Sequence, residues 1–243
     1  SNCTIYLANN QNTNLTIACD NNIKYRPPSY ENVDSTGDIS LFITNEHSSV
    51  VTINMKSYSN NIRVLNIQNT ENTENLLLSK KITSLYLSSN NLSMINGIMP
   101  LKSLTLAIKN ELPEDFKLKS FITSDNEFNK LYLKKLDLSD SQFKNIPEYF
   151  SLDTRLETLI LNDTIEIIGN HAFSELYNLN NIVLPKKLKE IGVRGLSNIG
   201  ANGNLRILDF RDTQLETLNS YSLASPAELK IYLPTTVTTI DSH

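Results

Sequence analysis

The sequence predicts an α/β solenoid, a fold in which short coils of chain stack on one another along an axis. Short β-prone runs of the pattern L-x-x-L-x-L recur along the chain, and behind most of them follows a pair of apolar residues three positions apart. Columns that recur about every 23 residues cannot lie on one face of a single helix or strand, but stacked coils bury them. The middle apolar residues of the runs are Leu41, Leu65, Leu85, Leu104, Leu136, Leu159, Ile182, Leu208 and Ile231.

Each coil is expected to contribute one strand to a parallel sheet on the concave side and to return through short helical or irregular turns on the convex side. The apolar pairs that form the second column are Leu92/Ile95, Phe143/Ile146, Ile165/Ile168, Leu188/Ile191, Leu215/Leu218 and Val237/Ile240. Between the strand and this column a small polar residue recurs, whose side chain can hydrogen-bond backbone groups of the turn that would otherwise be buried unpaired. These polar residues are Thr70, Asn90, Ser141, Thr164 and Thr213.

Several stretches carry a resemblance to a known family. The run ITSLYLSSNNL (82–92) resembles the leucine-rich repeat consensus L-x-x-L-x-L-x-x-N-x-L. The segment 156–240 is similar to the BspA-like subclass, with IIGNHAF (167–173), NIVLPKKLKEIG (181–192) and IYLPTTVTTI (231–240) as the matching stretches. The resemblance implies a leucine-rich repeat fold, and the BspA-like part implies a secreted or surface adhesin that binds host or matrix proteins.

The first 30 residues are expected to form an N-terminal cap. Both cysteines of the chain, Cys3 and Cys19, flank two short alternating apolar segments that are joined by asparagine-rich turn residues. Antiparallel pairing of these segments as a β-hairpin would place the cysteines opposite each other, at a Cα separation of roughly 4.5–5.5 Å that suits a disulfide. A disulfide indicates an oxidising, extracellular compartment, and the alternative is two free thiols in a cytosolic protein.

The solenoid is expected to occupy residues 31–243, with one irregular stretch. The step from Leu104 to Leu136 is 32 residues, which is too long for one repeat and too short for two, so we expect an irregular loop at about 109–130. After Ile240 the sequence stops within a repeat, without the polar cap that the end of a solenoid needs, so we expect the natural protein to continue beyond His243.

Four N-glycosylation sequons are compatible with secretion, although the asparagine content alone predicts at least as many. The candidate glycosylation sites are Asn2, Asn14, Asn91 and Asn162.

Charge and motif content argue against several classes of function. A formal net charge of −4 disfavours a nucleic-acid partner, which needs a basic surface. No apolar run approaches the roughly 18 residues of a membrane span, so we expect contact with a membrane only through segments outside this sequence. His47, His171 and His243 belong to no metal-ligand cluster, and neither a phosphate loop nor a nucleophile elbow is present. We therefore expect no enzyme activity, no cofactor and no metal.

The outward-facing residues of the predicted strands carry the functional signal. Side chains alternate across a strand, so the residue between the second and third apolar positions points away from the core. Ile160, Val183 and Ile207 in three successive strands predict a small apolar patch that fits a protein-binding surface, and scattered surface aliphatics are the alternative. The candidate ligand-binding residues are Tyr86, Asp137, Ile160, Val183, Ile207, Asp209 and Arg211.

Together these features predict an extracellular module that recognises a protein or peptide through its concave face, as the ectodomain fragment of a cell-surface receptor. The alternatives are the adhesin that the resemblance implies and an architectural spacer. The sequence indicates no particular oligomeric state.

Overall fold

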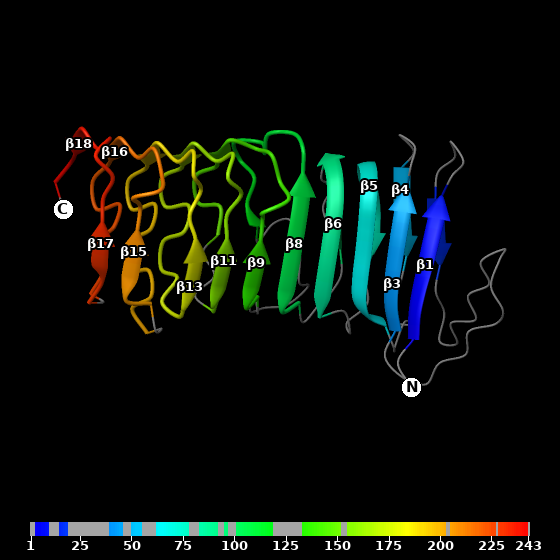
Figure 1. Cartoon of the computed structure of the whole chain (residues 1–243). Helices are drawn as coiled ribbons and strands as arrows, with labels where there is room; N and C mark the ends of the chain where they lie inside the picture. The colour runs from blue at the N-terminus through cyan, green and yellow to red at the C-terminus, as the bar shows by residue number, and fades with distance from the viewer. Residues whose placement is uncertain are drawn as a thin grey trace. The chain divides into compact units, whose positions relative to one another are not determined.

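The chain forms two compact units, which are described separately (Figure 1). The N-terminal unit comprises residues 1–108 and 121–130, and the C-terminal unit comprises residues 109–120 and 131–243. Within the described residues, no helix has the length and apolar character that crossing a membrane requires. The computed structural model describes residues 3–9, 15–18, 39–45, 50–54, 62–77, 83–91, 95–96, 101–118, 133–151, 155–202, 205–226 and 228–242.

The N-terminal unit is built from parallel strands, and its register follows the predicted apolar column. Leu41 is paired with Leu65, Leu65 with Leu85, and Leu85 with Leu104. The predicted middle positions therefore lie side by side across the sheet, and Leu85 and Leu104 are buried. The strands are β1 (Cys3–Asn9), β2 (Leu15–Ala18), β3 (Ile39–Asn45), β4 (Val50–Asn54), β5 (Ile62–Leu77), β6 (Ser84–Asn91), β7 (Ile95–Asn96) and β8 (Ser103–Ile108).

The predicted N-terminal hairpin is wrong. Strand β1 pairs in parallel with β3, and β2 pairs in parallel with β4, so each joins a different neighbouring strand of the following coil. Ile5 lies opposite Leu41, which extends the apolar column into the segment predicted to be a cap. Alternation of apolar residues specifies which face of a strand is buried but does not specify its partner. Cys19 lies outside the described residues, so the disulfide stays a prediction. The hairpin pairing from which we derived it is not formed.

The C-terminal unit consists of coils that each contribute one strand to a first sheet and one to a second sheet (Figure 1). On the first side β9, β11 and β13 pair in parallel, and β15 and β17 pair in parallel as a separate two-stranded sheet. We call these two groups of strands together the first sheet. Their bounds are β9 (Lys135–Asp137), β11 (Thr158–Ile160), β13 (Asn181–Val183), β15 (Ile207–Asp209) and β17 (Lys230–Tyr232). The second sheet is parallel in the order β10 (Asn145–Ile146), β12 (Ile167–Ile168), β14 (Glu190–Ile191), β16 (Thr217–Leu218) and β18 (Thr239–Ile240).

Of the short helical or irregular turns that we expected, the described connections of this unit form only the non-helical kind. Over the described part of residues 139–242, the second sheet and hydrogen-bonded turns occupy the side predicted to be convex, and no helix is formed there. Backbone groups of these turns bond to the next coil: the N–H of Phe173 donates to the carbonyl of Gly195 at 2.9 Å, and that of Leu196 to Ser222 at 2.9 Å. Since a helix would use these groups internally, coil-to-coil bonding excludes it.

The core lies between the two sheets and is filled by the predicted columns. Leu136, Leu159 and Leu208 of the first sheet are fully buried, and Ile168 and Ile191 of the second sheet are buried with them. Burying one such side chain contributes roughly 1.5–3 kcal/mol, so the repeated columns are the main source of stability. The largest fully buried side chains are Phe143, Phe150, Phe173 and Phe210.

Small polar residues satisfy buried backbone groups at the turns, as predicted. The Thr213 hydroxyl donates to the carbonyl of Phe210 at 2.7 Å, and the Thr164 hydroxyl donates to the carbonyl of Phe143 at 3.0 Å. The buried Asn162 side chain donates to the same Phe143 carbonyl at 2.8 Å. Thr213 thus satisfies a carbonyl of its own coil, whereas Asn162 and Thr164 satisfy a carbonyl of the preceding coil.

At the first strand of the second sheet, the Glu111 carboxylate takes the place of the backbone carbonyl that accepts hydrogen bonds in the next coil. In the sheet, the N–H groups of Glu166 and Ile167 share the carbonyl of Lys144, at 2.7 and 3.2 Å. At the first strand, the corresponding N–H groups of Lys144 and Asn145 instead bond to the two carboxylate oxygens of Glu111, at 2.8 and 3.3 Å. The described part of the predicted irregular loop, residues 109–118, therefore closes this edge of the C-terminal unit.

Removal of the Glu111 carboxylate is expected to destabilise the C-terminal unit. We predict that Glu111→Ala lowers the free energy of unfolding by about 1–2 kcal/mol, because the backbone N–H groups of Lys144 and Asn145 lose a charged acceptor. Urea denaturation followed by circular dichroism measures the change. Glu114→Ala, at an exposed carboxylate of the same turn, is the matched control, and equal losses in both variants would contradict this role.

Residues in the left-handed backbone region occur at equivalent places in successive coils. Glu175 and Asn198 are one such pair, with φ of 67° and 59°, since the N–H of Glu175 bonds to the carbonyl just before Asn198. A residue with a Cβ in this region costs about 1–2 kcal/mol. The other non-glycine residues with positive φ in the described part of the chain are Tyr149, His171, Arg194 and Tyr221.

Replacement of Glu175 by glycine is expected to stabilise the protein. Its side chain is exposed, so Glu175→Gly relieves the left-handed conformation at little cost in packing. We predict an increase of about 0.5–1 kcal/mol in the free energy of unfolding. Glu175→Ala keeps the strain and serves as the control in the same urea titration. A glycine variant no more stable than the alanine variant would show that the backbone is relaxed here.

Candidate functional site

The outward side chains of the first-sheet strands in the C-terminal unit form the surface that we call the strand face. In β9, β11, β13 and β15 the central residue is buried or half-buried, whereas Ile231 at the centre of the last strand, β17, is 38% exposed. The first and third residues of each strand point to the opposite side from the central residue. Short strands paired with their neighbours hold these side chains on rigid backbone. The strand face comprises Lys135, Asp137, Thr158, Ile160, Asn181, Val183, Ile207, Asp209, Lys230 and Tyr232.

The centre of the strand face is apolar. Ile160 and Val183 lie directly opposite each other in the pairing of β11 with β13. Val183 is 45% exposed and Ile207 is 54% exposed, values that are high for large aliphatic side chains. Ile207 is the first residue of β15 and lies opposite Lys230, whereas Val183 is the third residue of β13. The structure thus brings Ile160 and Val183 together and places Ile207 on the following coil.

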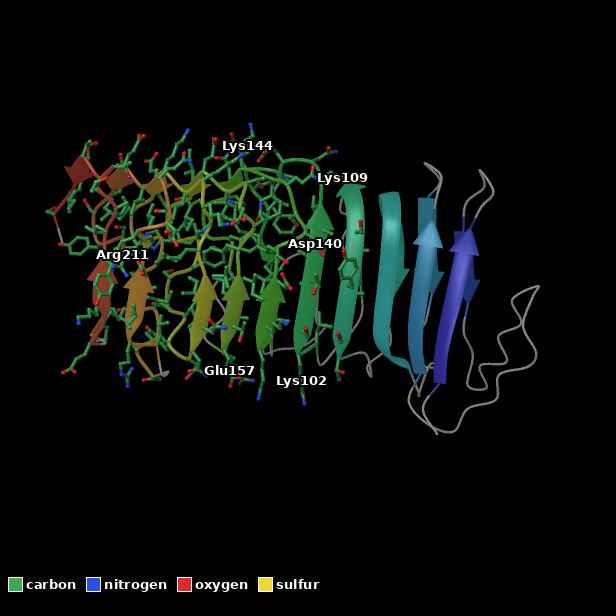
Figure 2. The ribbon with its side chains drawn as sticks, in the orientation of Figure 1. Lys102, Lys109, Asp140, Lys144, Glu157 and Arg211 are labelled. Atoms are coloured by element: carbon green, nitrogen blue, oxygen red, sulfur yellow. The ribbon has the colours of Figure 1, made fainter. Side chains whose placement is uncertain are left out.

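A polar cluster stands at the carboxyl end of β15 and β17, where Arg211 is found (Figure 2). The Arg211 guanidinium donates to both carboxylate oxygens of Asp209, at 2.9 and 2.7 Å, and its backbone N–H donates to one of them at 3.0 Å. The same guanidinium lies over the ring of Tyr232, 4.3 Å from the centroid. The Lys230 ammonium lies 5.8 Å from that centroid. The ion pair therefore holds Arg211 in one geometry above an aromatic ring.

Electrostatics in this cluster follow from the ion pair. Hydrogen bonds from the Arg211 side chain, and then from its backbone N–H, lower the pKa of Asp209 from 3.8 to about 2. Asp209 in turn raises the pKa of Arg211. Both groups are solvent-exposed and stay charged at neutral pH. Tyr232 and Lys230 complete the cluster and were missing from the predicted site, although the alternation of β17 already places both on the strand face.

Two other predicted site residues have different surroundings. The Asp137 carboxylate accepts hydrogen bonds from the backbone N–H and the hydroxyl of Ser139, at 2.9 and 2.6 Å, so it caps the end of β9. Tyr86 belongs to the N-terminal unit, where it is half-buried in β6 and paired in register with Asn66 and Thr105.

The predicted glycosylation site at Asn162 is not compatible with this fold. The Asn162 side chain is 1% exposed, and its amide nitrogen donates to the Phe143 carbonyl and to the Thr164 hydroxyl, so a glycan has no room there. Asn91 is the last residue of β6, and its use as a site stays a prediction. Asn2 and Asn14 lie outside the described residues. Among the residues that the structure describes, no group of three or more potential metal ligands is found.

Comparison with known proteins identifies the repeats. Residues 144–243 match the family described as BspA type Leucine rich repeat region, in six copies. No curated protein and no solved structure is found to match the chain. The matched segment includes the apolar pair Ile160 and Val183 and the cluster around Arg211.

The pKa of Asp209 tests the geometry of the polar cluster. We predict that the Asp209 carboxyl titrates near pH 2 in the wild-type protein and closer to 3.8 in Arg211→Gln, because the substitution removes the charged donor. Carbon-detected NMR of the carboxyl resonance measures both values. An unchanged pKa in Arg211→Gln would show that the ion pair does not form in solution.

Proposed function

Because its residues 144–243 are BspA-type leucine-rich repeats, we propose that this protein binds other proteins through the strand face of its C-terminal unit. The observation that carries the proposal is the exposure of Val183 and Ile207 on rigid strands, beside the ordered cluster of Arg211 and Tyr232. Exposed aliphatic residues next to tyrosine and arginine are typical of the energetic centres of protein interfaces.

Rigidity supports the same proposal. Arg211 is held by Asp209 and by the Tyr232 ring, so little side-chain entropy is lost when a partner binds it. Ile160 and Val183 project from paired strands, whose backbone is fixed by hydrogen bonds. Such a surface selects a partner by shape and apolar contact rather than by reorganisation.

We also propose that binding takes place outside the cell, as adhesion to proteins of a surface or matrix. The BspA-type repeats support an adhesin because this subclass is typical of secreted and surface proteins. The receptor-ectodomain hypothesis shares the binding face and differs in the partner, which would be a soluble ligand. The two hypotheses are therefore distinguished by which class of protein is bound.

A binding screen with variants of the strand face tests the proposal. The 243-residue protein is passed over a biosensor that carries purified matrix proteins and, separately, soluble secreted proteins. We expect binding to at least one matrix protein and a loss of about 10-fold in affinity for Val183→Ser/Ile207→Ser, because apolar contact area is removed. Both residues are about half-exposed, so the melting temperature should stay unchanged.

The matched control is Ile167→Ser, which replaces an aliphatic residue of 38% exposure on the second sheet. We expect full binding by this variant. Binding to no protein of either panel, or equal losses in both variants, would overturn the strand-face proposal. Binding to soluble proteins alone would favour the receptor.

A further inference from the structure

A row of exposed side chains follows the second sheet, on a surface distinct from the strand face. The row lies at the third residue after four successive second-sheet strands. Each backbone N–H donates to the carbonyl of the residue just before the next member, at 2.8–3.0 Å for the first three members. We call this row the corner ladder, and it consists of Tyr149, His171, Arg194 and Tyr221.

The side chains of the corner ladder stack in two pairs of neighbouring coils, Tyr149 with His171 and Arg194 with Tyr221. The rings of Tyr149 and His171 are nearly parallel, with centroids 4.8 Å apart and an interplanar angle of 7°. The Arg194 guanidinium lies over the ring of Tyr221, 5.0 Å from its centroid. At the start of the ladder the Lys117 ammonium lies 5.3 Å from the Tyr149 centroid. Tyr149 and Tyr221 are 40% and 42% exposed, so the stacked groups stand at the surface.

The backbone of the ladder is strained at every member. Their φ angles lie between 52° and 56°, in the left-handed region where glycine is the favoured residue. If only the backbone conformation mattered, glycine would be the most favourable residue at all four positions. Large aromatic and cationic side chains that are kept at a strained, exposed position point to a role outside folding.

Arg194 differs from Arg211 because its guanidinium is not paired with a carboxylate among the described residues. Both guanidinium groups lie over a tyrosine ring, but that of Arg211 is already paired with Asp209. Arg194 is exposed and forms no ion pair with any part of the chain that the structure describes. A guanidinium that lies over an aromatic ring and forms no ion pair among the described residues can bind a carboxylate in a bidentate manner.

The rest of the ladder favours an acidic ligand as well. Lys117 and His171 cover ring faces of Tyr149, so these faces are not available to stack on a sugar. Ring edges carry the positive end of the aromatic quadrupole, and the hydroxyl groups of Tyr149 and Tyr221 are hydrogen-bond donors. The exposed groups of the ladder therefore offer a guanidinium and tyrosine hydroxyl groups, all of which can donate hydrogen bonds to a carboxylate.

We propose that the corner ladder is a second binding surface, which recognises an acidic segment of a protein through the carboxylate-binding guanidinium of Arg194. It is independent of the strand face, and either proposal can fail without the other. Because the ladder is rigid, a partner loses little of its binding energy in ordering these side chains.

The test uses a labelled decaglutamate peptide and the 243-residue protein at low salt, with binding followed by fluorescence anisotropy. We expect the wild type to bind decaglutamate and not decaglutamine. Arg194→Gln is expected to weaken binding about 10-fold, because a charged bidentate contact is lost. Arg211→Gln removes an arginine from the strand face and should keep the wild-type affinity within about twofold.

A second variant separates binding from folding. Tyr221→Gly removes the ring beneath Arg194 and relieves a left-handed residue, so it should weaken decaglutamate binding without lowering the melting temperature. Failure of the wild type to bind, or equal losses in Arg194→Gln and Arg211→Gln, would overturn the proposal. Tighter binding of polygalacturonate than of decaglutamate would assign the ladder to an acidic glycan instead and would also overturn it.

Discussion

Hydrogen bonding between the backbones of successive coils is the constraint on which this structure depends. Some backbone groups in the turns of the C-terminal unit bond within their own coil, as the N–H of Thr213 does to the carbonyl of Phe210, but many others find their partner in a neighbouring coil. Neighbouring coils must therefore keep the same register along their strands and through the turn that follows each second-sheet strand. Gly192 shows how close this approach is, because a Cβ there would lie 2.7 Å from the backbone nitrogen of Asn170. The same register produces columns of equivalent residues, both in the core and on the surface.

The columns explain how much of the fold could be predicted. The aligned leucines from Leu41 to Leu104 and the second column from Phe143 to Leu218 were predicted correctly, because apolar residues must recur wherever coil stacks on coil. In the last described coil the predicted core residues Ile231 and Ile240 are instead 38% and 55% exposed. The hairpin prediction failed because the alternation of apolar residues in β1 and β2 is equally compatible with pairing to each other and with pairing to β3 and β4, which is what the structure shows. The convex side was predicted as short helical or irregular turns, and the described part of the C-terminal unit has no helix there, because many backbone groups of the turns bond to a neighbouring coil.

The candidate site was predictable only where strand alternation determines it. Alternation placed Val183 and Ile207 outside the core, and both are exposed. The Asp209–Arg211 ion pair is local, since the two residues are separated by one position. By contrast, the corner ladder has no periodic residue type, and its left-handed backbone is imposed by contacts between coils. Nothing in the sequence therefore assigned His171 a role beyond the turn, although it stacks on Tyr149 of the preceding coil.

Separation of buried columns from exposed ones allows one fold to carry different binding chemistries. Substitutions at Ile160 or Arg194 alter a surface column, whereas substitutions at Leu159 or Leu196 open the core. Each coil thus presents one set of side chains on the strand face and another at the corner, and the shared register fixes the spacing of both. Two chemically different surfaces, one apolar and one lined with hydrogen-bond donors, then follow from the same backbone without any change in the core.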